Sequence, residues 1–208
     1  MARVARPSAA AASGLMSNPV EDPKGLVRRE LRRAVSGITP EERAGFSAQL
    51  CERLRLLTPW RQAAWVLVFC PLPDEPDVKP VITEAFATGR LLSFPRFDGE
   101  SGAYELCQTR AWDELVLGRF GVLEPAAYCP RLMANQLDFA LVPGIGFSLD
   151  GDRLGRGKGY YDRLLARIPG FKCGVAFDCQ LVTRLPAERH DIRLNGILTP
   201  TRWQLIGS

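Results

Sequence analysis

A short basic and glycine-rich segment carries the strongest chemical signal in the chain. Gly155, Gly157 and Gly159 alternate there with Arg156 and Lys158. Glycine lets the backbone approach an anion closely and adopt positive φ, so that successive backbone N–H groups can surround the anion. The arginine adds a planar fork for phosphate oxygens, and the lysine adds a compact positive charge. The segment therefore predicts a site for the phosphate groups of a small ligand.

The residues that follow favour the same chemistry. A helix is predicted over 159–167, and its N-terminus would direct unpaired N–H groups and a partial positive charge at the preceding loop. Two standard phosphate motifs are absent, because GxxxxGK[ST] would require glycine at Asp152 and GxGxxG would require glycine at Tyr160. The alternative interpretation of these residues is a flexible, solvated loop.

Two apolar runs predict the strands that position this segment. Ala63–Cys70 and Asp138–Val142 both read as strands that are buried on both faces. Helical segments alternate with such strands, which indicates an α/β sheet covered on both sides. In open α/β sheets, ligands bind beyond the carboxyl ends of the strands. We therefore expect the basic segment and the proline-rich loop 71–76 to meet at that edge.

The remaining elements follow from periodicity and from capping residues. Thr39 is the expected N-cap of a helix that starts at Pro40 and ends near Leu57. Ala103–Gln108 alternates and is expected to be an edge strand. Further helices and strands are predicted at 24–36, 78–88, 91–95 and 171–177, with 197–198 and 203–205 pairing near the C-terminus.

Length and composition indicate a single globular domain. The chain has 208 residues and a net charge of +4, which is too small an excess for a protein that coats nucleic acid. Residues 1–23 predict a disordered tail, with an organellar presequence as the alternative, and residues 24–208 predict the domain. No apolar run is long enough to span a bilayer, and the six cysteines form no CxxC pair. A cytoplasmic location is expected.

The segment that begins at Leu141, LVPGIGFSLDGDRLGRGKGYYDRLL, resembles the signature of the 5-formyltetrahydrofolate cyclo-ligase family. Supporting pieces occur in order along residues 24–200: KxxxR, PDE, FGVLEP, VPG and HD. The resemblance implies a three-layer α/β/α sandwich with a largely parallel or mixed sheet, and a monomer. It also implies a reaction in which ATP and 5-formyltetrahydrofolate give ADP, phosphate and 5,10-methenyltetrahydrofolate, with Mg²⁺, through a phosphorylated formyl group.

The resemblance also implies roles for individual residues. Lys158 and Arg156 would be catalytic, and Asp162 and Asp191 would hold Mg²⁺. ATP would be bound by Lys24, Arg28, Arg153, Leu154, Gly155, Arg156, Gly157, Lys158, Gly159, Tyr160 and Tyr161. The folate would be bound by Cys70, Glu75, Arg156, Gly157, Lys158, Gly159 and Tyr160.

Each of these roles has a plainer alternative. Asp162 could be a favourable charge in the first turn of a helix, and Asp191 a solvated loop residue. Lys24 and Arg28 share one helical face, which could simply be solvated. Glu75 could belong to a polar turn. Asp74 competes with Glu75 for the folate contact, and Tyr160 and Tyr161 could pack the helix onto the sheet instead of stacking on substrate. Trp112 could stack on a flat ring but is expected in the core, and His190 is expected at the surface.

Two other functions remain compatible with the sequence. The first is a nucleotide- or RNA-binding module that keeps the basic loop but needs neither Glu75 nor Asp191. The second is another small-molecule kinase or ligase on the same fold. The partners expected for the leading hypothesis are small molecules, with neither nucleic acid nor membrane.

Overall fold

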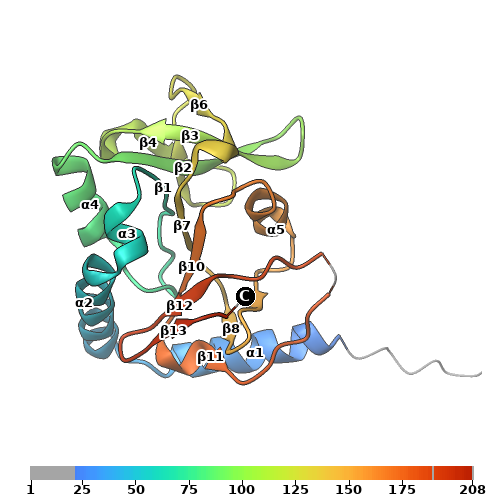
Figure 1. Ribbon diagram of the computed structural model, residues 1–208. Helices are drawn as coiled ribbons and strands as arrows, with labels where there is room; N and C mark the ends of the chain where they lie inside the picture. Colours follow the sequence, from blue (N-terminus) through green and yellow to red (C-terminus); the bar gives the residue numbers. More distant parts are fainter. Residues whose placement is uncertain (1–21, 189, 208) are drawn as a thin grey trace, which may run out of the picture.

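An eight-stranded mixed sheet forms the centre of the protein (Figure 1), a computed structural model that describes residues 22–188 and 190–207. The strand order is β13-β12-β10-β7-β1-β2-β3-β6. The strands from β12 to β2 run parallel, and antiparallel strands follow on both sides. The bounds are β1 Trp65–Leu67, β2 Leu91–Asp98, β3 Ala103–Thr109, β6 Arg131–Leu132, β7 Phe139–Val142, β10 Phe171–Val175, β12 Gly196–Leu198 and β13 Trp203–Leu205.

Two small sheets flank the central one. A three-stranded sheet has the order β11-β8-β9, and β4 and β5 form an antiparallel pair. Their bounds are β4 Leu115–Leu117, β5 Leu123–Pro125, β8 Gly146–Ser148, β9 Arg153–Leu154 and β11 Leu181–Val182. Single 3-10 turns occur at Trp112–Glu114, Ala134–Gln136 and Asp178–Gln180.

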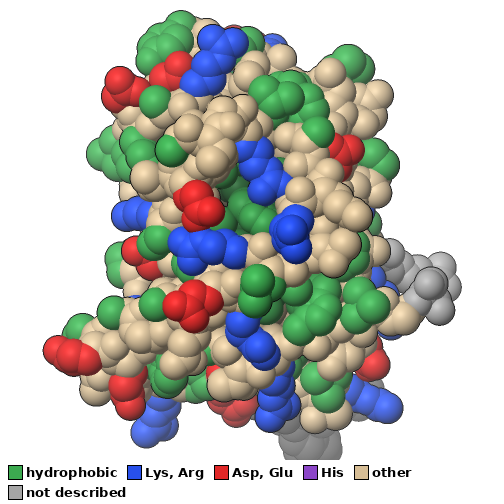
Figure 2. Space-filling model, turned by 60° about the vertical axis from the view of Figure 1, so that its left-hand side comes forward, with side chains coloured by type: hydrophobic (Ala, Val, Ile, Leu, Met, Phe, Trp, Pro, Cys, Tyr) green, Lys and Arg blue, Asp and Glu red, His purple; other side chains and the backbone are tan. Residues whose placement is uncertain are grey.

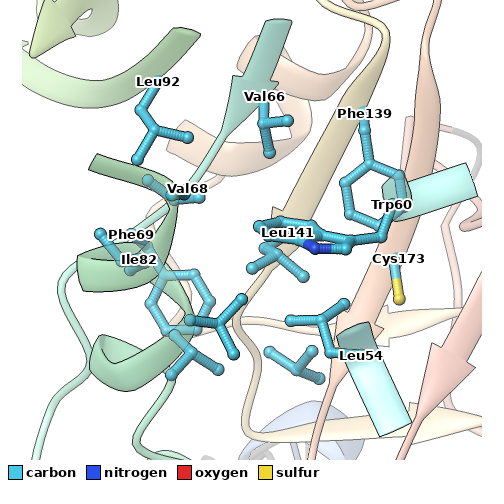
Figure 3. Close-up of a cluster of buried hydrophobic side chains, with 14 of the residues drawn as sticks. Leu54, Trp60, Val66, Val68, Phe69, Ile82, Leu92, Phe139, Leu141 and Cys173 are labelled. Atoms are coloured by element: carbon cyan, nitrogen blue, oxygen red, sulfur yellow. The ribbon is translucent and has the colours of Figure 1, made fainter. Parts of the chain in front are cut away.

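Three helices cover one face of the central sheet (Figure 1). They are α2 Pro40–Leu56, α3 Thr58–Gln62 and α4 Lys79–Ala87. Figure 3 shows the core between these helices and the strands, where Leu54, Trp60 and Ile82 point towards Val66, Phe139 and Leu141. The rings of Trp60 and Phe139 meet edge to face at 5.7 Å between centroids. Burial of large apolar side chains of this kind is the main source of folding free energy.

The other face is covered by α5, Tyr160–Leu165, whose Leu164 and Leu165 pack on the sheet. The remaining helix, α1 Pro23–Ser36, crosses the lower end of the sheet in Figure 1 beside β8 and β11. Leu31 of α1 packs there in a separate apolar cluster with Ile145 and Leu154. Because its apolar side is held in this way, α1 presents its N-terminal turns to the carboxyl ends of the parallel strands.

Local sequence explains where key elements begin and bend. Thr39 and Glu42 form a capping box at the start of α2, an interaction that stabilises a helix by about 1 kcal/mol. Phe147 of β8 is fully buried between two glycines. A Cβ at Gly144 or at Gly174 would lie 2.7 Å or 2.6 Å from its ring atoms. Both positions therefore require glycine while Phe147 fills this space.

The predicted α/β fold with a mixed, mostly parallel sheet is confirmed, and so is the pairing of 197–198 with 203–205. Three local expectations were wrong. The strand 103–108 is not the edge, because β6 pairs with β3 at Leu106 and Cys107. The helix predicted over 159–167 ends at Leu165. The first helix was predicted to begin at residue 24 but begins at Pro23, and residues 1–21 of the predicted tail lie outside the described residues.

Candidate active site

A cavity of about 590 Å³ opens at the carboxyl ends of the parallel strands. Phe69 and Cys70 reach it directly after β1, and Pro143 and Gly144 reach it after β7. The segment 153–162 forms a further wall. Every residue that sequence analysis assigned to ATP, folate or metal lines this cavity, namely Lys24, Arg28, Cys70, Glu75, Arg153, Leu154, Gly155, Arg156, Gly157, Lys158, Gly159, Tyr160, Tyr161, Asp162 and Asp191.

The three glycines of the basic segment have two local roles. Gly157 and Gly159 have φ angles of +97° and +64°, which only glycine adopts without strain. Gly155 leaves room for a cation, because a Cβ there would lie 2.7 Å from Nη1 of Arg153. Arg28 of α1 donates from Nε to the carbonyl oxygen of Gly155 at 2.9 Å. The backbone of the segment is therefore bent and held open beside two arginines.

Arg153 is part of the framework of the site and not of a flexible loop. It lies in β9, with its side chain only 4% exposed, and Nη2 donates to Oδ1 of Asp162 at 2.9 Å. Its guanidinium also lies 5.5 Å from the centre of the Tyr161 ring. The alternative interpretation of a flexible, solvated loop does not hold for Arg153 and Leu154, because they pair with β8 and turn their side chains into the protein. Arg153 thereby fixes the start of α5.

Arg156 connects the basic segment to the proline-rich loop. Its Nη2 donates to Oδ1 of Asp74 at 2.7 Å and to Oε1 of Glu75 at 3.2 Å. Asp74 is partly exposed, whereas the side chain of Glu75 is 6% exposed and also accepts from the backbone N–H of Leu72 at 3.0 Å. Burial raises the pKa of Glu75, while the Leu72 N–H and the Arg156 charge oppose this effect. Glu75, the expected folate contact, is therefore the more buried of the two carboxylates that Arg156 holds.

An ion-pair cluster joins the two ends of the described chain at the cavity. Nζ of Lys24 lies 2.8 Å from Oδ2 of Asp191 and 3.0 Å from Oε1 of Glu188. Partial burial lowers the pKa of Lys24, but the hydrogen bonds to Asp191 and Glu188 outweigh it and raise the pKa overall. Burial likewise raises the pKa of Asp191, but the hydrogen bonds from Lys24 and from the Glu188 N–H, together with the Lys24 charge, lower that pKa overall. Lys24 and Asp191 are thus both charged at neutral pH.

Lys158 is exposed on the cavity wall, and no salt bridge or side-chain hydrogen bond involves it in the part of the chain that the structure describes. Its neighbour Tyr160 instead belongs to an aromatic cluster with Phe97, Tyr104 and Phe120, with ring centroids 5.1 Å, 5.6 Å and 5.9 Å away. An ammonium group that faces a cavity without a carboxylate partner suits an anionic ligand.

Sequence analysis missed one buried carboxyl group on the same wall. Glu124 of β5 is 7% exposed and lines the cavity. It accepts a hydrogen bond at Oε2 from the backbone N–H of Phe97 at 3.2 Å. A signal was present, since a glutamate inside the apolar run Val122–Pro125 needs a reason to be buried. Phe120, also in this hairpin, lines the cavity as well.

The two aspartates proposed for Mg²⁺ present oxygen ligands of the kind this ion prefers. Each already has a cationic partner, Arg153 for Asp162 and Lys24 for Asp191. Within 22–188 and 190–207, no three His, Cys, Asp or Glu side chains gather closely enough to hold a metal unaided. Mg²⁺ usually takes one or two carboxylates and completes its shell with phosphate oxygens and water. The donor set therefore fits an ion that arrives with a nucleotide.

Other residues singled out from the sequence lie apart from this chemistry. Trp112 packs against Phe86 and Phe94 and donates from Nε1 to Thr83, so it lies half-buried against the core. His190 reaches the cavity rim but is largely exposed. On the face drawn in Figure 2, basic and acidic side chains are interspersed and form no continuous basic patch. Among the described residues, no helix has the length and apolar character needed to cross a membrane.

Comparison with known proteins identifies the family. The model of the 5-formyltetrahydrofolate cyclo-ligase family matches residues 20–200. The chain is 32% identical to the 5-formyltetrahydrofolate cyclo-ligase of Escherichia coli K12, covering 85% of this chain and 98% of that protein. It is 27% identical to the mouse 5-formyltetrahydrofolate cyclo-ligase, covering 86% and 94%.

Solved structures agree with the fold. The 5,10-methenyltetrahydrofolate synthetase of Aquifex aeolicus superimposes with a TM-score of 0.81 at 32% identity, covering 89% of this chain and 93% of that one. The synthetase of Mycoplasma pneumoniae, at 20% identity, shares the fold with a TM-score of 0.69. The family model spans nearly all described residues, including every residue of the cavity wall, and the chain therefore belongs to the 5-formyltetrahydrofolate cyclo-ligase family.

Proposed function

We propose that this chain uses ATP to convert 5-formyltetrahydrofolate into 5,10-methenyltetrahydrofolate, and that it does so in the cavity at the carboxyl ends of the strands. Family membership supports the reaction. The observation that carries the assignment of the site is the convergence of three separate segments on one cavity: the N-terminal turns of α1, the loop after β1, and the glycine-rich segment before α5.

The glycine-rich segment is proposed to bind the ATP phosphates. The bent backbone at Gly157 and Gly159 would direct N–H groups at the phosphates, and Lys158 and Arg28 would add positive charge beside them. The remaining nucleotide contacts are proposed for Lys24, Arg153 and Tyr161, of which Arg153 acts by holding the segment in place. Phosphoryl transfer requires positioned groups and stabilisation of the charge on the transferred phosphoryl more than covalent help from the protein.

The chemistry is proposed to proceed in two steps. The formyl oxygen attacks the γ-phosphorus, the bond to the β–γ bridging oxygen breaks, and ADP leaves. N10 then bonds to the activated formyl carbon, its proton is lost, and the carbon–oxygen bond breaks to release phosphate. Lys158 and Arg156 are the proposed catalytic residues, because both line the cavity beside the bent backbone and can neutralise the transferred phosphoryl group.

Asp162 and Asp191 are proposed to hold Mg²⁺ together with the phosphates. When bound there, the ion would neutralise charge on the β- and γ-phosphate oxygens. For the protein, this proposal means that Asp162 divides its oxygens between Arg153 and the ion. Asp191 would exchange part of its interaction with Lys24 for the ion, which frees the Lys24 ammonium group to approach phosphate.

The folate is proposed to lie between the proline-rich loop and the aromatic cluster. Glu75 would accept hydrogen bonds from the pterin, with Arg156 holding its carboxylate in place. Cys70 lies at the same wall, and burial raises its pKa to about 12, so it is a neutral thiol and acts as packing or a backbone contact. Tyr160 would offer its ring to the substrate. We also propose that the protein is a monomer and that it acts in the cytoplasm.

The test mixes protein, Mg-ATP and 5-formyltetrahydrofolate and follows the near-ultraviolet absorbance of the methenyl product together with ADP. Product and ADP are expected to appear in equal amounts, and neither without ATP. A protein that binds ATP yet releases no ADP and forms no methenyl product would contradict the proposal. If the chain were instead an RNA-binding module, it would bind RNA with an affinity that falls steeply with salt. Substitution of Glu75 or Asp191 would leave that affinity unchanged.

A further inference from the structure

Glu124 is a second buried carboxyl group in the cavity wall, and the reaction described above does not use it. It lies on β5, next to Val116 of β4 in the antiparallel pair. Glu124 is only 7% exposed, yet it lines the same cavity as Glu75 and Cys70. A carboxyl group is rarely buried to this extent without a partner or a function.

The partners of Glu124 differ from those of Glu75. Glu124 accepts from the Phe97 N–H at Oε2, and it forms no salt bridge within the described ranges 22–188 and 190–207. Arg96, whose charge acts on Glu124, is engaged elsewhere: it bonds to Glu105 at 2.6 Å and to the carbonyl oxygen of Ala126 at 2.6 Å. Glu75, by contrast, accepts directly from Arg156.

The groups around Glu124 favour its neutral form. Burial raises its pKa, and the Phe97 N–H and the charge of Arg96 on β2 oppose this only in part. Cys70 after β1 and Tyr104 on β3 also lie near, but burial raises the pKa of each to about 12, so both are uncharged. A buried carboxyl group with no directly bonded cation is stabilised as the acid.

The position of the carboxyl group is fixed by packing. A Cβ on Gly118 would collide with the Glu124 carboxyl, so glycine at 118 leaves the space that this group occupies. Gly118 is also held in the hairpin by its N–H, which donates to the carbonyl oxygen of Val122 at 2.8 Å. The hairpin therefore presents Glu124 in one place, with Oε2 occupied by the backbone.

We propose that Glu124 is a second folate-binding side chain, which donates a hydrogen bond from its neutral carboxyl group to a carbonyl oxygen of the reduced pterin. The inference rests on the proposed function. A reduced pterin carries N–H donors beside a carbonyl acceptor, so recognition needs both an acceptor and a donor from the protein. Glu75, bonded to a cation, supplies the acceptor, and Glu124, bonded to an N–H alone, supplies the donor. Two carboxyl groups in different surroundings thus take opposite roles.

The test compares wild type, Glu124→Gln and Glu124→Ala by their KM values for 5-formyltetrahydrofolate and for ATP. Glutamine keeps an acceptor for Phe97 and presents an N–H donor to the cavity, so its folate KM is expected to stay within about threefold of wild type. Alanine removes the donor, and the folate KM is expected to rise about tenfold or more while the ATP KM is unchanged.

The pH dependence separates hydrogen bonding to the substrate from mere support of Phe97. As pH rises through the raised pKa of Glu124, the acid of the wild type ionises and its amide counterpart does not. The ratio of folate KM in wild type to that in Glu124→Gln is expected to rise with pH, and effects of pH on ATP or folate cancel in this ratio. A constant ratio would overturn the proposal, as would a large loss in Glu124→Gln at neutral pH.

A further variant covers the case in which Glu124→Ala does not fold. Gly118→Ala keeps the carboxyl group but displaces it, and a raised folate KM with an unchanged ATP KM is expected. An unchanged folate KM in a folded Gly118→Ala or Glu124→Ala protein refutes the inference. If the proposed function itself is wrong, the wild type forms no methenyl product at all, which is a different result from an active wild type with unaffected variants.

Discussion

Lys158→Ala is the substitution that most directly tests the assignment of the ATP site. Lys158 is exposed on the cavity wall and has no salt bridge among the described residues. Its removal therefore takes away no packing, and the free energy of unfolding is expected to change by less than about 0.5 kcal/mol. In the reaction, a preorganised charge on the transferred phosphoryl group contributes about 3–4 kcal/mol, so kcat is expected to fall about 10²–10³-fold.

The assay is the rate of methenyl product formation at saturating ATP and folate, with ADP release measured in parallel. Arg167→Ala is the matched control, because it removes one exposed positive charge just beyond α5 and outside the cavity. Lys158→Arg keeps the charge but changes its shape, and only partial activity is expected. Activity of Lys158→Ala within about threefold of wild type corresponds to less than about 0.7 kcal/mol and would refute the reasoning.

Three further substitutions probe the framework and the pH response. Arg153→Ala is expected to destabilise the protein by about 3–5 kcal/mol in thermal or chemical unfolding, because it leaves Asp162 partly buried and unpaired; a shift below about 1 kcal/mol would contradict a structural role for the pair. The lowered pKa of Asp191 means that its contribution to stability is present above its unfolded value of 3.8 and is lost as pH falls through the folded value. The unfolding free energies of wild type and Asp191→Asn should therefore converge in acid, and a difference that persists there would count against the Lys24 pair. Gly159→Ala is expected to cost about 1–2 kcal/mol from strain at its positive φ and to raise the ATP KM, both measurable on the same preparation.

The parts of the fold that the sequence predicted are those with strong local signals. Ala63–Cys70 and Asp138–Val142 are continuous apolar runs, and they became β1 and β7 at the centre of the sheet. Thr39 and Pro40 marked the start of α2 because capping is decided within one helical turn. The glycine-rich segment was found for the same reason, since alternating glycines and cations are visible without any knowledge of the fold.

The features that escaped prediction depend on contacts between distant segments. Arg153 looked like a loop cation, and its burial follows from the pairing of β9 with β8. The sequence around Phe97 gives no sign that the Phe97 N–H bonds to Glu124, which lies 27 residues further along the chain. The strand β6 has only two residues and no periodicity to detect, which is why 103–108 looked like an edge. Tertiary pairing of this kind overrides what composition alone suggests.

The space filled by Phe147 links Gly144, three residues before it, to Gly174 on another strand. Its ring touches the places where Gly144, on the cavity wall, and Gly174, in the middle of β10, would otherwise carry a side chain. A larger residue at 144 or 174 is tolerated only if the ring at 147 becomes smaller. Across relatives, these three positions should therefore vary as one unit, and redesign of the cavity wall near Gly144 has to begin with Phe147 behind it.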